Sequence, residues 1–452
     1  MLALATALLV AGAGLASGSS STPDSSATIA AGWAHSCALT SAGGLACWGD
    51  GVYGQLGDGT GDDHLKPVGV LGLSTGVRSV ISGDVYTCAI LSTRALECWG
   101  DNETGQLGDG STSSEGQPVG VSGLSSGVEA VAAGGDRPSG HTCAVLSGGA
   151  VKCWGDNEYG QLGDRTTKTR HAPVAVSGLS SGVEAVAAGT SHTCALLSSG
   201  GVECWGSNGE GELGDGTTND RHVPVPVSGL SSGVEGIAAN GEQTCAVLST
   251  GAAECWGYNA EGQLGDGTTK NRAVPVAVAG LSGVRSIAAG VYHTCALLAG
   301  GGVECWGDNE FGQLGDGTTT ARLRPVAVGG LPANVQAIAA GDEHSCALMK
   351  DRSFACWGSN HYGQLGNGKQ TYELSVFVYG RGTVRGKGFR CGDYCDAEYA
   401  AKTKVALKTH AAKGWVFSRW RDDCKSRKRK RVCTLIMNSD ALVTARFTKR
   451  RG

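Results

Sequence analysis

Cysteine is the residue whose spacing in this chain most directly implies chemistry. Of the 18 cysteines in 452 residues, fourteen form seven pairs whose members lie ten positions apart: Cys37 with Cys47, Cys88 with Cys98, Cys143 with Cys153, Cys194 with Cys204, Cys245 with Cys255, Cys295 with Cys305, and Cys346 with Cys356. A hairpin centred on Ser199 places Cys194 opposite Cys204. Opposed strand residues have Cα atoms about 4.5–5.5 Å apart, within the range of about 4.4–6.8 Å that a disulfide requires. We expect a disulfide in each pair; the alternative is seven pairs of free, buried cysteines.

Histidine recurs two positions before the first cysteine of a pair, which raises the question of a metal site. The five members are His35, His141, His192, His293 and His344. Tyr86 and Gln243 occupy the equivalent position in the second and fifth copies. A position that repeats in this way normally supports the scaffold, so we expect no metal and no cofactor. The tryptophan after each second cysteine is expected to pack between repeats: Trp48, Trp99, Trp154, Trp205, Trp256, Trp306 and Trp357.

Two further patterns match catalytic or nucleotide-binding motifs without their context. Gly-Leu-Ser-Ser-Gly at 123–127, 178–182 and 229–233 fits the Gly-x-Ser-x-Gly turn of hydrolases. That turn occurs once and precedes a helix, whereas this one is a recurring spacer. Residues 363–370 approach a phosphate-binding loop, but Gln370 stands where Ser or Thr would hold magnesium, and no helix is expected after it.

The elements that carry these residues repeat with a period typical of a propeller. Successive first cysteines lie 51, 55, 51, 51, 50 and 51 residues apart. One repeat contains four short apolar runs separated by turn residues, at 183–188, 193–197, 201–205 and 224–227, and none has the period of a helix. Seven such units predict an all-β, seven-bladed β-propeller. We expect the run 374–378 to complete the blade begun by 28–57 and to close the ring.

The composition divides the chain into four parts. Residues 1–16 are apolar and small residues follow, which predicts a signal peptide and a Ser-rich leader over 1–27, although no Lys or Arg precedes the apolar run. The propeller is expected over 28–378, a basic β domain over 379–448 and a basic tail over 449–452. An even number of cysteines fits an oxidising compartment. The apolar run is too short to span a membrane.

The repeated words resemble those of a known family. His-Thr-Cys-Ala-Leu, Cys-Trp-Gly-x-Asn and Gly-Gln-Leu-Gly-Asp-Gly-Thr are similar to the regulator-of-chromosome-condensation repeat over about 28–378. The resemblance implies a seven-bladed propeller, and the cysteine pairs are most similar to its secreted bacterial members. Family members include nucleotide exchange factors for a small GTPase, domains of ubiquitin ligases and secreted binders, so the fold alone does not settle the function.

The C-terminal part differs from the rest in charge. Residues 381–452 contain 20 Lys and Arg against 6 Asp and Glu, while the remainder contains 17 against 35. Five short runs predict a β domain, and Gly-Arg-Gly-Thr-Val at 380–384, the run 414–420 and Val-Thr-Ala-Arg-Phe at 443–447 resemble the divergent internalin B-repeat. Among three connectivities we favour Cys391 with Cys395 and Cys424 with Cys433 over a zinc site.

This charge distribution predicts two arrangements for the basic part. It either docks on the acidic ring or contacts an anionic surface such as nucleic acid, teichoic acid or lipopolysaccharide. The basic run 425–431 is expected to be a solvated loop rather than a nuclear targeting signal. No specific nucleic-acid partner is expected.

Departures from the repeat are the better pointers to function. The third copy inserts four residues within 134–140, which makes Asp136, Arg137 and Pro138 a candidate partner-binding loop. Variable loops at 62–64, 168–171, 219–222 and 270–272 are further candidates.

We expect no catalytic residue, and we interpret the chain as a secreted or cell-surface, extracellular or periplasmic, protein-binding scaffold. The alternatives are a nucleotide exchange factor for a small GTPase and a polysaccharide-acting enzyme. Carboxylates or histidines from different blades converging at one mouth would support the enzyme.

Overall fold

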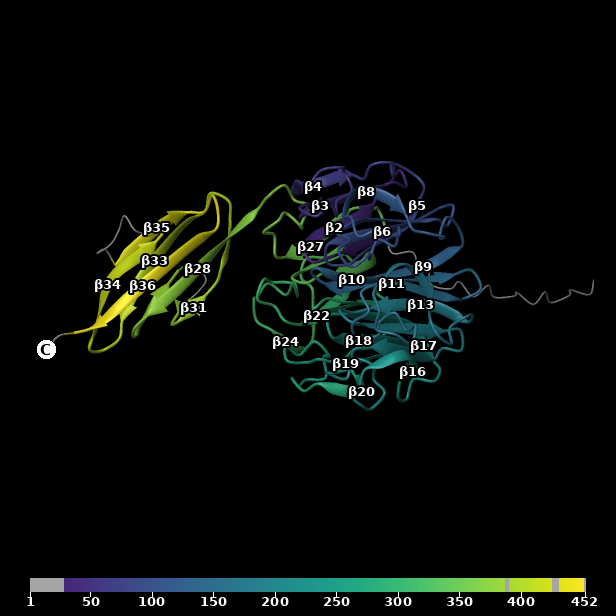
Figure 1. Ribbon diagram of the computed structural model, residues 1–452. Helices are drawn as coiled ribbons and strands as arrows, with labels where there is room; N and C mark the ends of the chain where they lie inside the picture. Colours follow the sequence, from purple (N-terminus) through teal and green to yellow (C-terminus); the bar gives the residue numbers. More distant parts are fainter. Residues whose placement is uncertain (1–27, 387–389, 425–430, 451–452) are drawn as a thin grey trace, which may run out of the picture.

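The computed structural model describes residues 28–386, 390–424 and 431–450, and every regular element in them is a strand. Figure 1 shows a ring of sheets joined to a smaller β domain. The expected leader over 1–27 lies outside the described residues, as do positions 425–430 of the basic run. No helix in the described part is long and apolar enough to cross a membrane.

Seven antiparallel sheets form the ring, and we number them as blades 1 to 7 in chain order. Each sheet is made of strands consecutive in sequence, which confirms the expected fold class. Blade 1 contains β1 (Ile29–Ala31), β2 (His35–Leu39), β3 (Leu45–Gly49) and β4 (His64–Gly69); blade 2 contains β5 (Val77–Ser82), β6 (Tyr86–Leu91), β7 (Leu96–Gly100) and β8 (Glu115–Gly120); blade 3 contains β9 (Val128–Asp136), β10 (Ser139–Leu146), β11 (Val151–Gly155) and β12 (Arg170–Ala175); blade 4 contains β13 (Val183–Ala188), β14 (His192–Leu197), β15 (Val202–Gly206) and β16 (Arg221–Pro226); blade 5 contains β17 (Val234–Asn240), β18 (Gln243–Leu248), β19 (Ala253–Gly257) and β20 (Arg272–Ala277); blade 6 contains β21 (Val284–Ala289), β22 (His293–Leu298), β23 (Val303–Gly307) and β24 (Arg322–Ala327); blade 7 contains β25 (Val335–Ala340), β26 (His344–Met349) and β27 (Phe354–Gly358).

The central hairpin of each blade has the register that the cysteine spacing predicts. Cys194 lies directly opposite Cys204, and the same pairing recurs in the other six blades. All seven expected pairs are disulfides, with Cα atoms 4.0–4.1 Å apart, slightly closer than expected: Cys37 with Cys47, Cys88 with Cys98, Cys143 with Cys153, Cys194 with Cys204, Cys245 with Cys255, Cys295 with Cys305, and Cys346 with Cys356. These cysteines are buried with the exception of Cys356, which is partly buried, and each bond joins the two middle strands of its blade. The alternative of free, buried cysteines is therefore wrong for all seven pairs, including Cys47, Cys98 and Cys305.

Removing one of these disulfides should destabilise the ring measurably. Replacing Cys245 and Cys255 by Ala opens a ten-residue loop in the unfolded chain, and chain entropy predicts a loss of about 2.5–3 kcal/mol in the free energy of unfolding. Urea denaturation under non-reducing conditions measures the loss. The matched control replaces Cys424 and Cys433, nine residues apart in the C-terminal domain, and should leave the transition of the propeller unchanged. A loss below about 1 kcal/mol in the first variant would contradict this estimate.

The expected closure of the ring by 374–378 is wrong. Blade 1 obtains its fourth strand, β4, from its own repeat, whereas blade 7 has three strands. Residues 374–378 belong to β28 (Thr371–Tyr379), which pairs in parallel with β36 (Ala441–Lys449) of the C-terminal domain. The ring is closed instead by hydrogen bonds between blades 7 and 1: the indole Nε1 of Trp48 donates to the carbonyl of Gln364 at 2.8 Å, and the backbone N–H of Gly368 donates to the carbonyl of Leu65 at 2.8 Å.

The C-terminal domain is a sandwich of two sheets, and its strands begin at Thr371. One sheet has the order β31 (Tyr394–Cys395), β28, β36, β34 (Trp415–Asp422), with β32 (Glu398–Ala400) also paired to β28; the other has the order β30 (Arg390–Cys391), β29 (Gly382–Arg385), β33 (Lys404–Ala411), β35 (Val432–Ile436). Val376, Leu407 and Trp420 are among the residues that form the core between the sheets. The disulfides of Cys391 with Cys395 and of Cys424 with Cys433 confirm the favoured connectivity, and the described residues contain no free cysteine.

Candidate binding site at one mouth of the propeller

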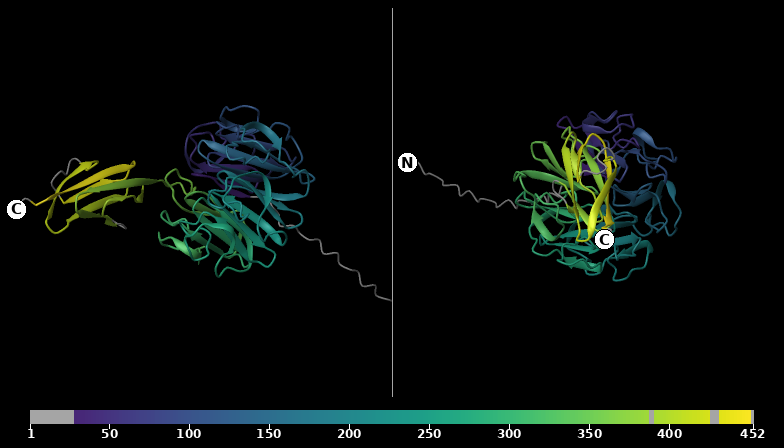
Figure 2. Two further views of the ribbon diagram at one scale, coloured as in Figure 1. Left: turned by 60° about the horizontal axis from the view of Figure 1, so that its bottom comes forward. Right: turned by 90° about the vertical axis from the view of Figure 1, so that its left-hand side faces the viewer.

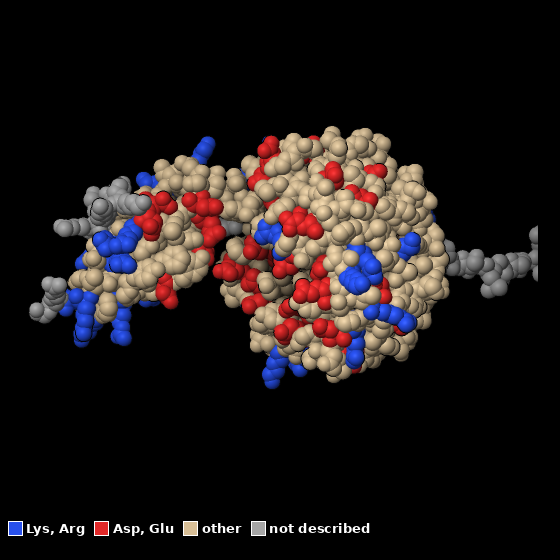
Figure 3. Space-filling view, in the orientation of Figure 1, with Lys and Arg blue, Asp and Glu red and all other residues tan. Residues whose placement is uncertain are grey.

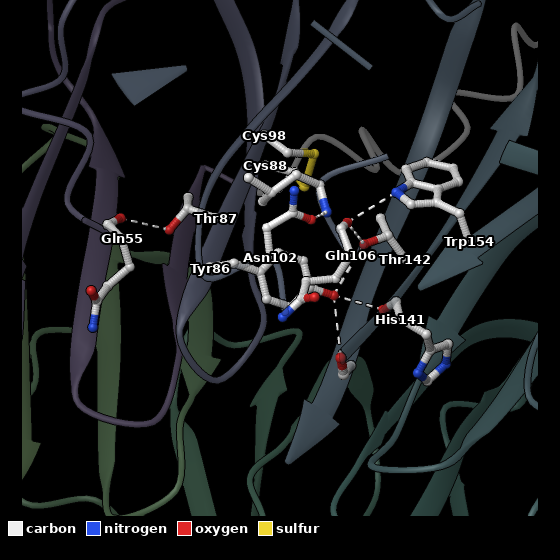
Figure 4. Close-up of a disulfide and its surroundings, with 12 residues drawn as sticks. Gln55, Tyr86, Thr87, Cys88, Cys98, Asn102, Gln106, His141, Thr142 and Trp154 are labelled. Atoms are coloured by element: carbon white, nitrogen blue, oxygen red, sulfur yellow. Dashed lines mark hydrogen bonds between the residues drawn. A yellow bond between two sulfur atoms is a disulfide. The ribbon is translucent and has the colours of Figure 1, made fainter. Parts of the chain in front are cut away.

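Most of the conspicuous repeated residues lock neighbouring blades together. Around the disulfide of blade 2, Thr87 donates to the carbonyl of Gln55 in blade 1 at 3.0 Å, while Trp154 and Thr142 of blade 3 donate to the carbonyl of Gln106 at 2.9 and 2.8 Å (Figure 4). The corresponding indole of every blade donates to the backbone of the blade before it. The expectation that the tryptophans pack between blades is therefore confirmed.

The five recurrent histidines take part in the same hydrogen-bonded contacts between neighbouring blades. His35 Nε2 lies 2.9 Å from Thr87 Oγ1 of the next blade. Because that hydroxyl gives its own proton to the carbonyl of Gln55, the imidazole must donate through Nε2. The Nδ1 atoms of His35, His141, His293 and His344 are buried without a partner. Burial lowers the pKa of His35 to about 4 and that of His344 to about 3, so these rings are neutral parts of the scaffold.

Tyr86 and Gln243 replace histidine without losing the contact. The Tyr86 hydroxyl donates to the carbonyl of His141 at 2.6 Å, and Gln243 Nε2 donates to the carbonyl of Gly290 at 2.8 Å. The structural interpretation of this repeat position is confirmed. Within the described residues, no group of three or more His, Cys, Asp or Glu is placed to hold a metal ion.

The variable loops contain a repeated internal ion pair. Arg170 binds Asp164 with two hydrogen bonds of 2.9 and 2.7 Å, and Arg221, Arg272 and Arg322 repeat the arrangement. Burial alone would raise the pKa of each paired carboxyl, but hydrogen bonds from the neighbouring threonine, followed by those from these arginines, hold it below its usual range. These arginines therefore stabilise the loops, which weakens the case for a partner at those positions.

The turn that precedes each histidine position varies in sequence from blade to blade. We define the mouth as the residues that these turns present: Trp33, Asp84, Asp136, Arg137, Thr190, Glu242, Tyr292 and Asp342. Backbone hydrogen bonds link neighbouring turns, for example from Trp33 N to the carbonyl of Asp84 at 3.0 Å. A rigid, regular ring thus holds a set of variable side chains around one end of its axis.

The inserted residues of blade 3 lengthen the hairpin between β9 and β10 at this mouth. Asp136 pairs with Ser139, which leaves Arg137 and Pro138 at the tip, and all three candidate loop residues are exposed. The Arg137 guanidinium reaches past blade 2 and lies 3.5 Å from the centre of the Trp33 ring in blade 1. Trp33 also packs on Tyr362 of blade 7, with ring centres 5.1 Å apart. The insertion therefore brings an arginine onto an aromatic surface shared by two blades.

Carboxylates from several blades converge beside this arginine. Burial raises the pKa of Asp84 to about 7, repulsion from Asp136 adds to the rise, and Arg137 opposes it. Burial, followed by repulsion from Asp84, raises the pKa of Asp342 well above its usual range. Asp342 Oδ1 is buried without a hydrogen-bond partner. The mouth is therefore an acidic, partly desolvated surface that favours cationic groups.

A hollow of about 340 Å³ adjoins the inserted hairpin. Arg137, Tyr159, Glu158, Glu212 and Glu242 are among its lining residues, so it continues the acidic surface from blade 3 to blade 5. A larger hollow of about 470 Å³ lies between blades 1 and 2. It is lined mainly by turn residues with Glu97 as its one ionisable side chain, and we do not regard it as a candidate site.

Sequence reasoning found the inserted loop but missed its surroundings. Trp33, Asp84 and Asp342 lie in different repeats, 51 or more residues apart, and only closure of the ring brings them together. A signal was present, because the positions between the glycine and the histidine differ in most copies, whereas the two flanking positions change only in blades 2 and 5.

Comparison with known families agrees with this architecture. The model of the RCC1-like domain matches residues 15–282, and models of the regulator of chromosome condensation repeat match 301–348 and, separately, 284–313 and 335–364. The divergent InlB B-repeat domain matches 372–451, which includes β28 of the C-terminal domain except for its first residue, Thr371.

Relatives differ widely in the share of their length that the match covers. The ultraviolet-B receptor UVR8 of Arabidopsis thaliana is 32% identical over 352 residues, covering 77% of this chain and 68% of the receptor. The E3 ubiquitin-protein ligase HERC2 of Homo sapiens is 38% identical over 208 residues, which is 45% of this chain but 4% of the ligase.

Solved structures support the fold. Human WBSCR16 superposes with a TM-score of 0.63 at 24% identity, covering 71% of this chain and 86% of the other. Yeast RCC1 (Prp20), solved bound to Kap60, gives 0.60 at 22% identity, covering 72% and 80%. At these identities the likeness concerns the fold alone.

Proposed function

Because the chain belongs to the family of RCC1-like propellers, we propose that it is a secreted or cell-surface, protein-binding scaffold without catalytic activity. Its mouth binds cationic side chains of a partner protein, and its basic C-terminal domain contacts an anionic surface. Nine disulfides support an oxidising location outside the cytosol. They also argue against the alternative of an exchange factor acting on a small GTPase in the cytosol.

The contact between Arg137 and Trp33 carries the proposal for the mouth. It is an arginine placed on an aromatic ring, beside carboxylates that its positive charge stabilises in their ionised form. A partner that presents lysine or arginine side chains would find the same chemistry at Tyr292, which is 47% exposed, and at Glu242, which lines the hollow. The inserted hairpin thus provides an example, within the chain, of how a cationic group is bound here.

Charge reversal at the exposed tip tests this role. In the full-length protein, a photo-reactive amino acid at Pro138 should crosslink one discrete protein from the native surroundings, and Asp136→Lys should weaken binding of that purified protein at least tenfold by repulsion. The midpoint of thermal unfolding should not fall, because Asp136 is exposed. Lys168→Glu, a reversal on an exposed loop of the same blade, should leave the affinity unchanged. The absence of any crosslinked protein, or equal effects of both reversals, would sink the proposal for the mouth.

One observation favours a second candidate, a polysaccharide-acting enzyme. Carboxylates of blades 2, 3 and 7 converge at the mouth, and Asp84, with a pKa of about 7, has the proton affinity of a general acid at neutral pH. If this candidate holds, Asp84→Asn abolishes turnover of a polysaccharide, whereas the scaffold role predicts no turnover by the wild-type protein.

A further inference from the structure

Three cations stand in a row across the outer face of one sheet of the C-terminal domain. In the sheet β30-β29-β33-β35, Arg390 lies directly opposite Arg385, and Arg385 lies directly opposite Lys408. Val384 and Leu407, their neighbours along the strands, are buried in the core, so the three cations point outward, and all three are exposed. We call these three residues the basic row.

The basic row is unfavourable for the fold itself. Like charges directly opposite one another on neighbouring strands are destabilising. The other outward positions of β29, β33 and β35 offer no compensation, since they are Thr383, Lys404, Ala406, His410, Val432, Thr434 and Ile436. In the described part of the chain, none of the recorded salt bridges includes a member of the row. A surface that places three cations opposite one another, with no carboxylate among its described outward positions, is typical of one that binds an external anion.

Docking on the acidic propeller does not account for the row. The contact between the two domains involves a carboxylate of the C-terminal domain, since Asp440 pairs with His361 of blade 7 at 3.5 Å. Asp396, also in the C-terminal domain, is close enough to Glu310 of blade 6 to contribute to the rise in its pKa, which burial dominates. On the face shown in Figure 3, most of the Lys and Arg side chains of this domain lie toward the end distant from the propeller. Of the two arrangements expected from sequence, contact with an external anionic surface is therefore favoured.

The shape of the row indicates the kind of anion. Neighbouring strands lie about 4.8 Å apart, so the three cations span roughly 10 Å in a straight line across the sheet. This arrangement suits a linear polymer whose charges recur at short intervals. The two arginines match phosphate through paired N–H donors, which a lysine or a diffuse positive field does not provide. The described outward positions carry no Phe, Tyr or Trp, and so offer no platform for stacking nucleobases.

We propose that the basic row binds the phosphodiester groups of a polyol-phosphate polymer, in which short polyols join successive phosphates. This deepens the anionic-surface part of the proposed function and rests on it. The side chains of the basic row contact only the phosphate groups of the polymer, so recognition depends on the spacing of its charges rather than on the identity of the polyol. The propeller mouth, whose charge is opposite, remains available for a protein.

A binding experiment with the full-length protein tests the assignment. The probe is a synthetic glycerol-phosphate oligomer titrated at several salt concentrations, with wild type, the double variant Arg385→Gln and Lys408→Gln, and a matched control. The control, Arg419→Gln and Arg421→Gln, removes the same charge from two exposed positions on the other sheet of the domain. We expect the first variant to bind at least tenfold more weakly and to lower the slope of log K against log salt by about 1.5, as two lost phosphate contacts predict. The control should change the affinity less than twofold.

Each other outcome overturns a specific part of the proposal. Equal losses in both double variants would show that net charge, not the row, binds the polymer. Tighter binding of oligothymidylate than of the glycerol-phosphate oligomer at equal salt would replace the polyol-phosphate by nucleic acid. If neither of these nor polyglutamate binds at low salt, the anionic-surface part of the proposed function fails as well. Thermal unfolding serves as the control for folding of the variants. Because the substitutions relieve repulsion between like charges, the unfolding midpoint of the row variant should equal or exceed that of wild type. A lower midpoint would contradict the claim that the row is unfavourable for the fold.

Discussion

Lowering the pH from 6.5 to 4.5 should destabilise the propeller by a net amount on the order of 3 kcal/mol, because five buried histidines remain neutral in the folded ring. Burial lowers the pKa of each to about 3 or 4 from a usual value of 6.5. Between these values the unfolded chain binds more protons at the histidines than the folded one, so the histidine contribution to stability falls as the pH falls and stops falling below about pH 3. Asp84 and Asp50, whose pKa values burial raises to about 7 and about 6, titrate in the opposite sense and, with Asp342, offset much of the loss.

The chain itself suggests the variant that isolates this effect. Gln243 occupies the histidine position of blade 5 and donates to backbone carbonyls of the next blade without a titrating group. Replacing His141 and His293 by Gln should therefore remove about 2 kcal/mol per pH unit from the slope of unfolding free energy against pH between 5 and 6. Urea denaturation across this range measures the slope. His171→Gln, at an exposed position, is the control and should leave the slope unchanged. An unaltered slope in the double variant would show that the buried histidines do not set the acid sensitivity.

The sequence predicted the parts of this fold that depend on local pairing. The positions of Cys194 and Cys204 follow from a constant index sum across one tight turn, and the structure has that register in all seven blades. The assignment of 374–378 failed because alternating apolar residues fit any sheet with one buried face. Leu374, Val376 and Val378 are buried as such a strand requires, but their partner is β36, more than 60 residues later in the chain. Local pattern fixes the strand and its buried face, but not the sheet that receives it.

The candidate site is a harder case for the same reason. Arg137 is visible in the sequence as part of an insertion, but its contact with Trp33 joins blades 1 and 3, which blade 2 separates. The views in Figure 2 show that the C-terminal domain stands on one side of the ring. Tyr362 and Asp440 link that side to the mouth, because Tyr362 packs on Trp33 and its neighbour His361 pairs with Asp440. A partner at the mouth would therefore lie close to both domains, a relation that no repeat pattern encodes.

Trp205→Ala should be among the most damaging single substitutions that leave the disulfides intact, costing about 4 kcal/mol of unfolding free energy. The indole belongs to blade 4 and is fully buried against Cys143, Cys153 and Leu162 of blade 3. The cost is mainly that of the cavity, because the carbonyl of Gln161 that receives the indole proton at 2.8 Å also accepts from Thr193 at 2.9 Å.

Two further variants separate the energetic cost of the cavity from the cost of the lost hydrogen bond and from the cost of removing any aromatic residue. Trp205→Phe retains most of the volume without the N–H donor and should cost about 1–2 kcal/mol. Trp33→Ala removes a half-buried indole at the mouth and should cost less than Trp205→Ala, because Trp33 is only partly buried whereas Trp205 is fully buried. Gly163 packs closely on the indole of Trp205, since a Cβ at this position would lie 2.9 Å from the indole nitrogen. If Trp205→Ala and Trp33→Ala cost the same, stability does not depend on the packing between blades, and the repeated tryptophan would need another explanation.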